Sequence, residues 1–301
     1  MIIMVVSLLE AIDPYGIYDK NLFNLKYSFA TNVLCAKRLI EILHNERNIL
    51  VFGTSRSARI SPAILHEEVI NLDCIYGNPS SVIDFLNRLD QQSIKNISKI
   101  YYCIDWNCFI DDSKYDRVNY QDWKAILIYK IKHLNLSVIG FAQQKIFLNF
   151  NGEPNKYYHS KGYAVRHNDG NPNFPIIPYN DVEMTSKDIV SVLSKIDKFA
   201  KTHSIEIVYF MPTLPAGFDR LWDFGMFSRQ LRLYLDYIDG IYDFTYVEGI
   251  SNNRQLFADY SHLSTNGLKK LFETQFNEKN YITSKNLDAH LSEYKKYYKY
   301  K

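Results

Sequence analysis

Short apolar runs alternate with longer amphipathic segments along most of this chain, and this alternation constrains the fold more than any other sequence feature. The apolar runs are typical of strands that are buried on both faces of a parallel sheet. Strands are predicted at 49–52, 72–76, 100–104, 137–141, 205–211 and 242–246. Helices are predicted around 30–44, 62–69, 81–89, 123–133, 186–201, 218–237 and 265–277. The pattern predicts an α/β fold with an open, doubly wound parallel sheet, and we find no internal repeat.

The composition is that of a globular protein with a sizeable core. The chain has 301 residues, of which 47% are hydrophobic and 23% charged, and this is enough for one large domain. A net charge of +2 gives no general basic field, so nucleic acid is not an expected partner. The 24 tyrosines are compatible with a surface that faces carbohydrate, and equally with compositional drift. Neither the cysteines nor the histidines show the spacing of metal ligands, so neither a metal nor a cofactor is predicted.

The first residues, MIIMVVSLLEAI, are apolar but too short to span a bilayer, and they lack the features of a cleaved signal peptide. Two explanations remain open for them. They form a buried strand or helix, or they are the end of a membrane anchor that begins upstream of Met1. We therefore treat 1–25 as an apolar membrane-proximal or packing segment and 26–301 as a single α/β domain.

A long segment rich in Gly, Asn, Pro and Tyr interrupts the alternation near 150–180. Loops of this length in a compact domain are often lids or binding loops, although disorder is an alternative. His159, Arg166 and His167 are candidate substrate contacts there, or exposed polar residues without a role.

Two further segments carry residues that suit catalysis. In NILVFGTSRSARISP (48–62), an apolar strand ends in Gly-Thr-Ser-Arg-Ser and a helix begins a few residues later. Such a junction suits a tight turn or a nucleophile. In LFADYSHLSTNGLKKL (256–271), Asp259 and His262 are close enough in sequence for the carboxylate to orient the imidazole. Alone, this second motif usually indicates a surface turn.

Together the two segments resemble the nucleophile and Asp-x-x-His blocks of the SGNH, or GDSL-like, hydrolase superfamily. The match is closest to envelope-associated members that begin with a membrane-proximal segment and read GTSR at the serine. The resemblance implies a flavodoxin-like sheet of about five strands in the order 2-1-3-4-5. It also implies Ser55 as nucleophile, His262 as general base and Asp259 as the group that orients the imidazole. We then expect Ser55 Oγ within roughly 2.6 to 3.5 Å of one ring nitrogen of His262, and Asp259 at the other.

The oxyanion hole of that superfamily uses the backbone amide of the nucleophile, a glycine amide and an asparagine side chain. The resemblance places Ser55 and Gly77 in the first two positions, but the third is occupied by Asp105. An ionised carboxylate there would oppose catalysis. Either Asp105 turns away and Asn107 or Asn78 supplies the amide, or two backbone donors suffice, or the chemistry has been lost.

The residues around the proposed hole have several open roles. Asp105 is also interpretable as a polar residue that ends a strand and caps a turn. Arg56 either holds an anionic substrate group or pairs with a carboxylate. With Asn78, these residues are the candidate substrate contacts.

The resemblance thus implies a serine-dependent acyl esterase or O-acyltransferase that acts through an acyl-enzyme. The substrate that it implies is of the carbohydrate type, such as an envelope polysaccharide or peptidoglycan, or another small acyl ester. The alternative is a catalytically inactive protein of the SGNH fold that binds carbohydrate or assists assembly. The expected location is the cell envelope, either membrane-anchored through the N-terminus or periplasmic, with the cytoplasm as the alternative.

Overall fold

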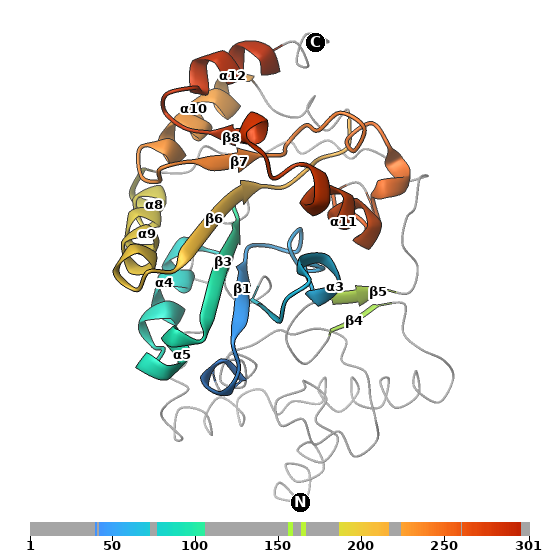
Figure 1. Cartoon of the computed structure of the whole chain (residues 1–301). Helices are drawn as coiled ribbons and strands as arrows, with labels where there is room; N and C mark the ends of the chain where they lie inside the picture. Colours follow the sequence, from blue (N-terminus) through green and yellow to red (C-terminus); the bar gives the residue numbers. More distant parts are fainter. Residues whose placement is uncertain are drawn as a thin grey trace, which may run out of the picture.

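Figure 1 shows the computed structural model of the chain, which describes residues 40, 42–72, 77–105, 156–158, 164–166, 187–216, 224–259 and 261–295. The predicted strand 137–141 and helix 123–133 lie outside these residues, as does the N-terminal segment 1–25. The two explanations for that segment therefore both stay open. Within the described residues, the helices are too short or too polar to cross a membrane.

A six-stranded, mostly parallel sheet forms the centre of the molecule (Figure 1). Its order is β2-β1-β3-β6-β7-β8, and the first five strands are parallel while β8 is antiparallel to β7. The strands are β1 (Asn48–Phe52), β2 (Val69–Asn71), β3 (Ile97–Cys103), β6 (Glu206–Met211), β7 (Ile241–Asp243) and β8 (Tyr281–Ile282). The α/β class and the parallel sheet are confirmed, and numbering the five parallel strands along the chain gives the order 2-1-3-4-5. The edge strand β8 was not predicted, because a run of two residues carries no readable period.

Helices cover both faces of the sheet. Alternate strand residues point to opposite sides, so each face carries apolar side chains that the helices bury. Leu50 and Phe52 of β1 belong to one apolar cluster, whereas Ile49 and Val51 belong to another. The first cluster packs against α4 (Pro79–Asn87), α5 (Gln91–Lys95), α8 (Lys187–Ser191), α9 (Leu193–Thr202), α10 (Phe224–Leu235) and α12 (Leu287–Tyr294). The second packs against α3 (Pro62–Leu65) and α11 (Thr265–Thr274). The arrangement is compatible with a doubly wound α/β fold.

A separate antiparallel pair lies within the predicted insertion near 150–180. It consists of β4 (Lys156–Tyr158) and β5 (Ala164–Arg166). Arg166 is thus a strand residue, and the other two candidate contacts, His159 and His167, fall outside the described residues.

Some predicted boundaries were wrong for local reasons. The second strand was predicted at 72–76 but runs over Val69–Asn71, and 73–76 lie outside the described residues. Asn71 interrupts the apolar run from which a buried strand is predicted, because it is polar although only 1% exposed. Its amide donates to the carbonyls of Ser57 (2.9 Å) and Ile60 (3.0 Å), which satisfies a polar group in the core. The helix predicted at 62–69 ends early because His66 adopts a left-handed conformation, with φ of 57°.

Candidate active site

The turn after β1, residues 53–60, carries Ser55 and is called the nucleophile turn below, after the role that the resemblance implies for Ser55. Backbone amides of Ser57 and Ile60 donate to the carbonyls of Thr54 (2.8 Å) and Ser57 (2.9 Å), which closes successive tight turns. Ser55 is exposed, whereas residues 56–60 are all buried. Ser55 is thus the one exposed residue of this tightly packed turn.

Gly53 begins the nucleophile turn and is a required glycine. Its φ is +147°, a conformation that side chains disfavour. A Cβ at this position would lie 2.7 Å from Cys103 Cβ and 2.7 Å from Ser57 Oγ. The turn therefore passes directly over the end of β3.

The loop that carries His262, residues 257–264, is called the histidine loop. It is a small antiparallel hairpin, since Phe257 bridges Leu263 and the Ala258 amide donates to the His262 carbonyl at 2.8 Å. Ser264 then caps α11 by accepting a hydrogen bond from the Gly267 amide at 3.1 Å.

Inside the histidine loop, Asp259 and His262 are held together by hydrogen bonds within the loop itself. Asp259 Oδ1 accepts from the backbone amides of Ser261 (2.9 Å) and His262 (3.0 Å), which fixes the carboxylate. The Nδ1 atom of His262 lies 2.8 Å from Oδ1 and 2.9 Å from Oδ2 of the same carboxylate. Ser261 Oγ lies 3.0 Å from the same Nδ1.

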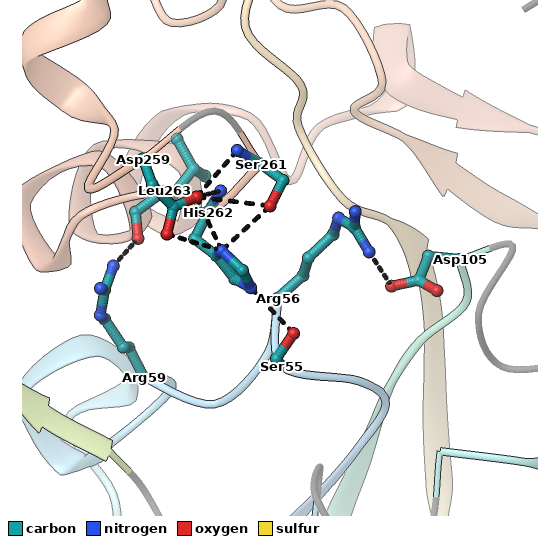
Figure 2. Close-up of polar contacts among 8 residues, drawn as sticks. All are labelled: Ser55, Arg56, Arg59, Asp105, Asp259, Ser261, His262 and Leu263. Atoms are coloured by element: carbon teal, nitrogen blue, oxygen red, sulfur yellow. Dashed lines mark hydrogen bonds and ion pairs between the residues drawn. The ribbon is translucent and has the colours of Figure 1, made fainter. Parts of the chain in front are cut away.

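Figure 2 shows how the two segments meet. Ser55 Oγ lies 2.8 Å from His262 Nε2, although the two residues are 207 positions apart in the sequence. This distance falls within the predicted range, and Asp259 is at the other ring nitrogen, as expected. The geometry is that of a serine, histidine and aspartate in series.

Protonation follows from the surroundings of each group. Burial raises the pKa of Asp259, but hydrogen bonds from His262 and from the loop amides outweigh it, and the net pKa is well below its ordinary value of 3.8. The ionised carboxylate is an acceptor only, so His262 Nδ1 carries the proton that joins them.

The imidazole of His262 is held in its neutral form. Burial is the largest cause that lowers its pKa below 6.5, Asp259 acts in the opposite direction, and the positive charges of Arg56 and Arg59 add to the lowering. A neutral ring with its proton on Nδ1 leaves the Nε2 lone pair to accept from the Ser55 hydroxyl. The serine therefore faces a base that is ready to take its proton.

Gly77 lies against the nucleophile turn, as the resemblance implies. A Cβ on Gly77 would be 2.8 Å from the Gly53 carbonyl oxygen, and the Tyr102 hydroxyl donates to the Gly77 carbonyl at 3.0 Å. Only glycine allows this close approach of the two backbones. Asn78 is buried, and its side-chain oxygen caps α4 by accepting from the Ser80 amide at 2.8 Å. Asn107 lies outside the described residues.

Asp105 is fully buried and turns toward the nucleophile turn. Its Oδ2 accepts a hydrogen bond from the Thr54 hydroxyl. It also accepts from Arg56 Nη1 at 3.0 Å (Figure 2). The side chains of Arg56 and Asp105 are 4% and 0% exposed. Of the two roles left open for Arg56, the structure shows the second, in which Arg56 pairs with a carboxylate. As placed, these two residues form an ion pair with each other and do not offer open charges to a substrate.

Sequence reasoning missed two residues of the site. Arg59 is buried, and its Nη1 donates to the Leu263 carbonyl in the histidine loop (Figure 2). Ser261 is 4% exposed and contacts both Asp259 and His262. A second arginine soon after the serine, in TSRSAR, was a signal for Arg59, but its partner is a distant backbone carbonyl that no motif reveals.

Among the described residues, no group of three or more His, Cys, Asp or Glu side chains is placed to hold a metal ion. Comparison of the chain with models of protein families and with curated proteins finds no match.

Proposed function

We propose that this protein is a serine-dependent acyl esterase or O-acyltransferase of the SGNH type. The observation that carries the proposal is the 2.8 Å approach of Ser55 Oγ to His262 Nε2, with His262 Nδ1 bonded to Asp259. A serine hydroxyl is a weak nucleophile until a base removes its proton, and this arrangement supplies the base and its orienting carboxylate.

In the first half of the reaction, Ser55 Oγ attacks the acyl carbonyl carbon while its proton moves to His262 Nε2. The imidazolium that forms is stabilised by the ionised Asp259. The tetrahedral intermediate collapses, the alcohol leaves with the proton from Nε2, and the acyl group remains on Ser55.

The developing oxyanion needs donors near Ser55. The backbone amide of Ser55 and that of Gly77 are the candidates, and the position of Gly77 against the Gly53 carbonyl supports the second. Asp105 would oppose an oxyanion if its charge were unbalanced, but Arg56 neutralises it at 3.0 Å. Two backbone donors beside a neutral ion pair are therefore consistent with acyl transfer.

In the second half, water or a sugar hydroxyl loses its proton to His262 Nε2 and attacks the acyl-serine, so hydrolysis and transfer differ only in the acceptor. The substrate class that we propose, an acylated carbohydrate of the cell envelope, rests on the resemblance and on the abundance of tyrosine, whose rings stack on sugars. Incubation with acetylated glycans, with and without an acceptor sugar, separates the two reactions.

One observation favours the alternative function, an inactive protein of this fold that binds carbohydrate or assists assembly. It is the buried carboxylate of Asp105 where the superfamily carries a neutral amide. Such a protein would keep the Asp259 and His262 geometry as a structural remnant.

The deciding experiment uses 4-nitrophenyl acetate and a fluorophosphonate probe. We expect wild type to release nitrophenol and to be labelled on Ser55, and Ser55→Ala to do neither while it unfolds at the wild-type temperature. Ser284→Ala, at an exposed serine, is the matched control and should behave as wild type. A wild-type protein that is neither labelled nor active on any acyl ester would favour the binding role.

A further inference from the structure

The distance between Ser55 and His262 has to be set by tertiary contacts, because the nucleophile turn and the histidine loop belong to opposite ends of the fold in sequence. Apolar packing brings them together, since Ile60 of the turn and Leu263 of the loop are both buried in the same cluster. Packing of this kind is non-directional and does not by itself fix a hydrogen-bond distance. A directional contact between the two segments is therefore needed to fix this distance.

Arg59 makes such a contact. It lies four residues after Ser55 and is 6% exposed, and its Nη1 donates to the carbonyl of Leu263, the residue directly after His262. The carbonyl of His262 itself accepts from the Ala258 amide at 2.8 Å. The backbone on the C-terminal side of His262 is thus held by its own hairpin and by the nucleophile turn.

Burying a guanidinium has a desolvation cost that an apolar residue at the same position would not have. A charge-assisted hydrogen bond to a carbonyl offsets part of that cost and also has a defined direction. The contact therefore adds a geometric constraint to an interface that apolar side chains could have filled.

We propose that Arg59 is a positioning residue that holds the histidine loop against the nucleophile turn and so sets the distance between the Ser55 hydroxyl and His262 Nε2. This proposal rests on the proposed function for its effect on rate, but the contact itself can be tested without turnover.

Arg59 also acts on His262 through its charge. In the described part of the chain, the charged groups that influence the imidazole most are Asp259 on its own loop and Arg56 and Arg59 on the nucleophile turn. Removal of the Arg59 charge should raise the pKa of His262. The effects of the Arg59 hydrogen bond and of its charge can be separated. Lysine keeps the charge but replaces the planar guanidinium with a single ammonium on a different aliphatic chain.

The experiment compares Arg59→Lys, Arg59→Gln and the control Arg254→Gln, which removes an exposed arginine just before the histidine loop. Both Arg59 variants should lower kcat for the nitrophenyl ester roughly ten- to a hundredfold with KM nearly unchanged, because misplacing a base by a fraction of an ångström affects the reacting geometry. The acid limb of the pH profile should move to higher pH in Arg59→Gln and stay in place in Arg59→Lys. Arg254→Gln should change neither quantity.

Two outcomes would overturn the role of Arg59. One is a folded pair of Arg59 variants that keep kcat within about twofold of wild type. The other is loss of folding in both variants, which would assign Arg59 to global stability instead of the position of His262.

NMR of the His262 ring separates this inference from the proposed function. The ring signals are assigned by their loss in His262→Asn. In Arg59→Gln the titration of His262 should move to higher pH, and in Arg59→Lys the Nε2 resonance should shift, because the hydrogen bond from Ser55 changes. If these shifts occur in a protein without turnover, the function fails and the contact stands. If wild type is active and neither shift occurs, the contact has no role in positioning and the function stands.

Discussion

In the described part of the chain, two clusters that each contain an aspartate, a histidine and a hydroxyl are arranged in different orders. In the first, the imidazole of His262 lies between Asp259 (2.8 Å) and the Ser55 hydroxyl (2.8 Å). In the second, the carboxylate of Asp243 lies between His290 and a hydroxyl.

In the second cluster, Thr245 Oγ1 donates to Asp243 Oδ1 at 2.5 Å, and His290 Nε2 lies 2.7 Å from Oδ2. The Thr245 hydroxyl also contacts the hydroxyl of Tyr294. Asp243 and Thr245 are buried, and His290 and Tyr294 belong to α12. The cluster therefore fastens α12 to the end of β7.

For the proposed proton transfer, the order of the groups and the exposure of the hydroxyl are more important than the residue types. A hydroxyl held by a carboxylate is oriented but not deprotonated, whereas a hydroxyl that meets a neutral imidazole can lose its proton to it. Ser55 is exposed and meets the imidazole; Thr245 is buried and meets the carboxylate.

The largest effect is expected from exchanging the two histidines for alanine. His262→Ala should lower ester turnover by roughly 10⁶-fold, or to background, with little change in stability. His290→Ala should leave turnover unchanged and lower the free energy of unfolding by about 2 kcal/mol, because it removes a hydrogen bond to a buried carboxylate. Initial rates and urea unfolding of both variants measure this. A folded His290→Ala variant that has lost the wild-type ester turnover would contradict the difference in role between the two clusters.

Exchanging the two aspartates for asparagine should give a smaller loss of rate. Asp259→Asn should lower kcat by roughly 10⁴-fold, since the neutral amide no longer holds the Nδ1 proton in place. Asp243→Asn should act on stability alone. Steady-state kinetics with circular dichroism melts compare the two variants, and equal kinetic effects would contradict the assignment.

The Asp105→Asn variant tests the ion pair next to the site. Removing one partner leaves the buried Arg56 charge uncompensated, so we expect a loss of about 3 kcal/mol in unfolding free energy and a lower rate. The double variant Arg56→Gln with Asp105→Asn should recover part of the stability. If Asp105→Asn instead raised the rate, Asp105 would be acting at the oxyanion and not as the partner of Arg56.

The smallest expected effect is that of pH. Because the pKa of His262 is lowered below 6.5 in the folded protein, kcat/KM should rise with pH to a plateau that is reached by neutral pH, with its midpoint below 6.5. In the window between the lowered pKa and 6.5, the unfolded state binds more protons at this residue, so His262 stabilises the fold increasingly as pH rises. A rate profile with its midpoint above 6.5 would show that the imidazole is not held neutral.

Features whose interaction partners are close along the chain could be predicted from the sequence alone. Alternating apolar runs indicated a parallel sheet, because their period and burial are local properties. Asp259 and His262 could be paired from the sequence, since the side chains that form this contact are three residues apart and one short loop orients both. The glycine at position 53 was also readable as the start of a turn.

The resemblance to the SGNH superfamily predicted that Ser55 meets His262, but composition, periodicity and spacing did not reveal which distant residues are in contact. The partners of Arg56 and Arg59 became known from the tertiary structure alone. The contacts of Ser55 with His262, of Arg56 with Asp105 and of Arg59 with Leu263 span 207, 49 and 204 residues. The role of Asn71, a polar strand residue, was likewise not predicted, because its amide donates to a carbonyl of the nucleophile turn. Such contacts leave no periodic pattern in the sequence. They arise where apolar packing brings the carboxyl ends of parallel strands to one edge of the sheet, and that packing is nonlocal and non-directional.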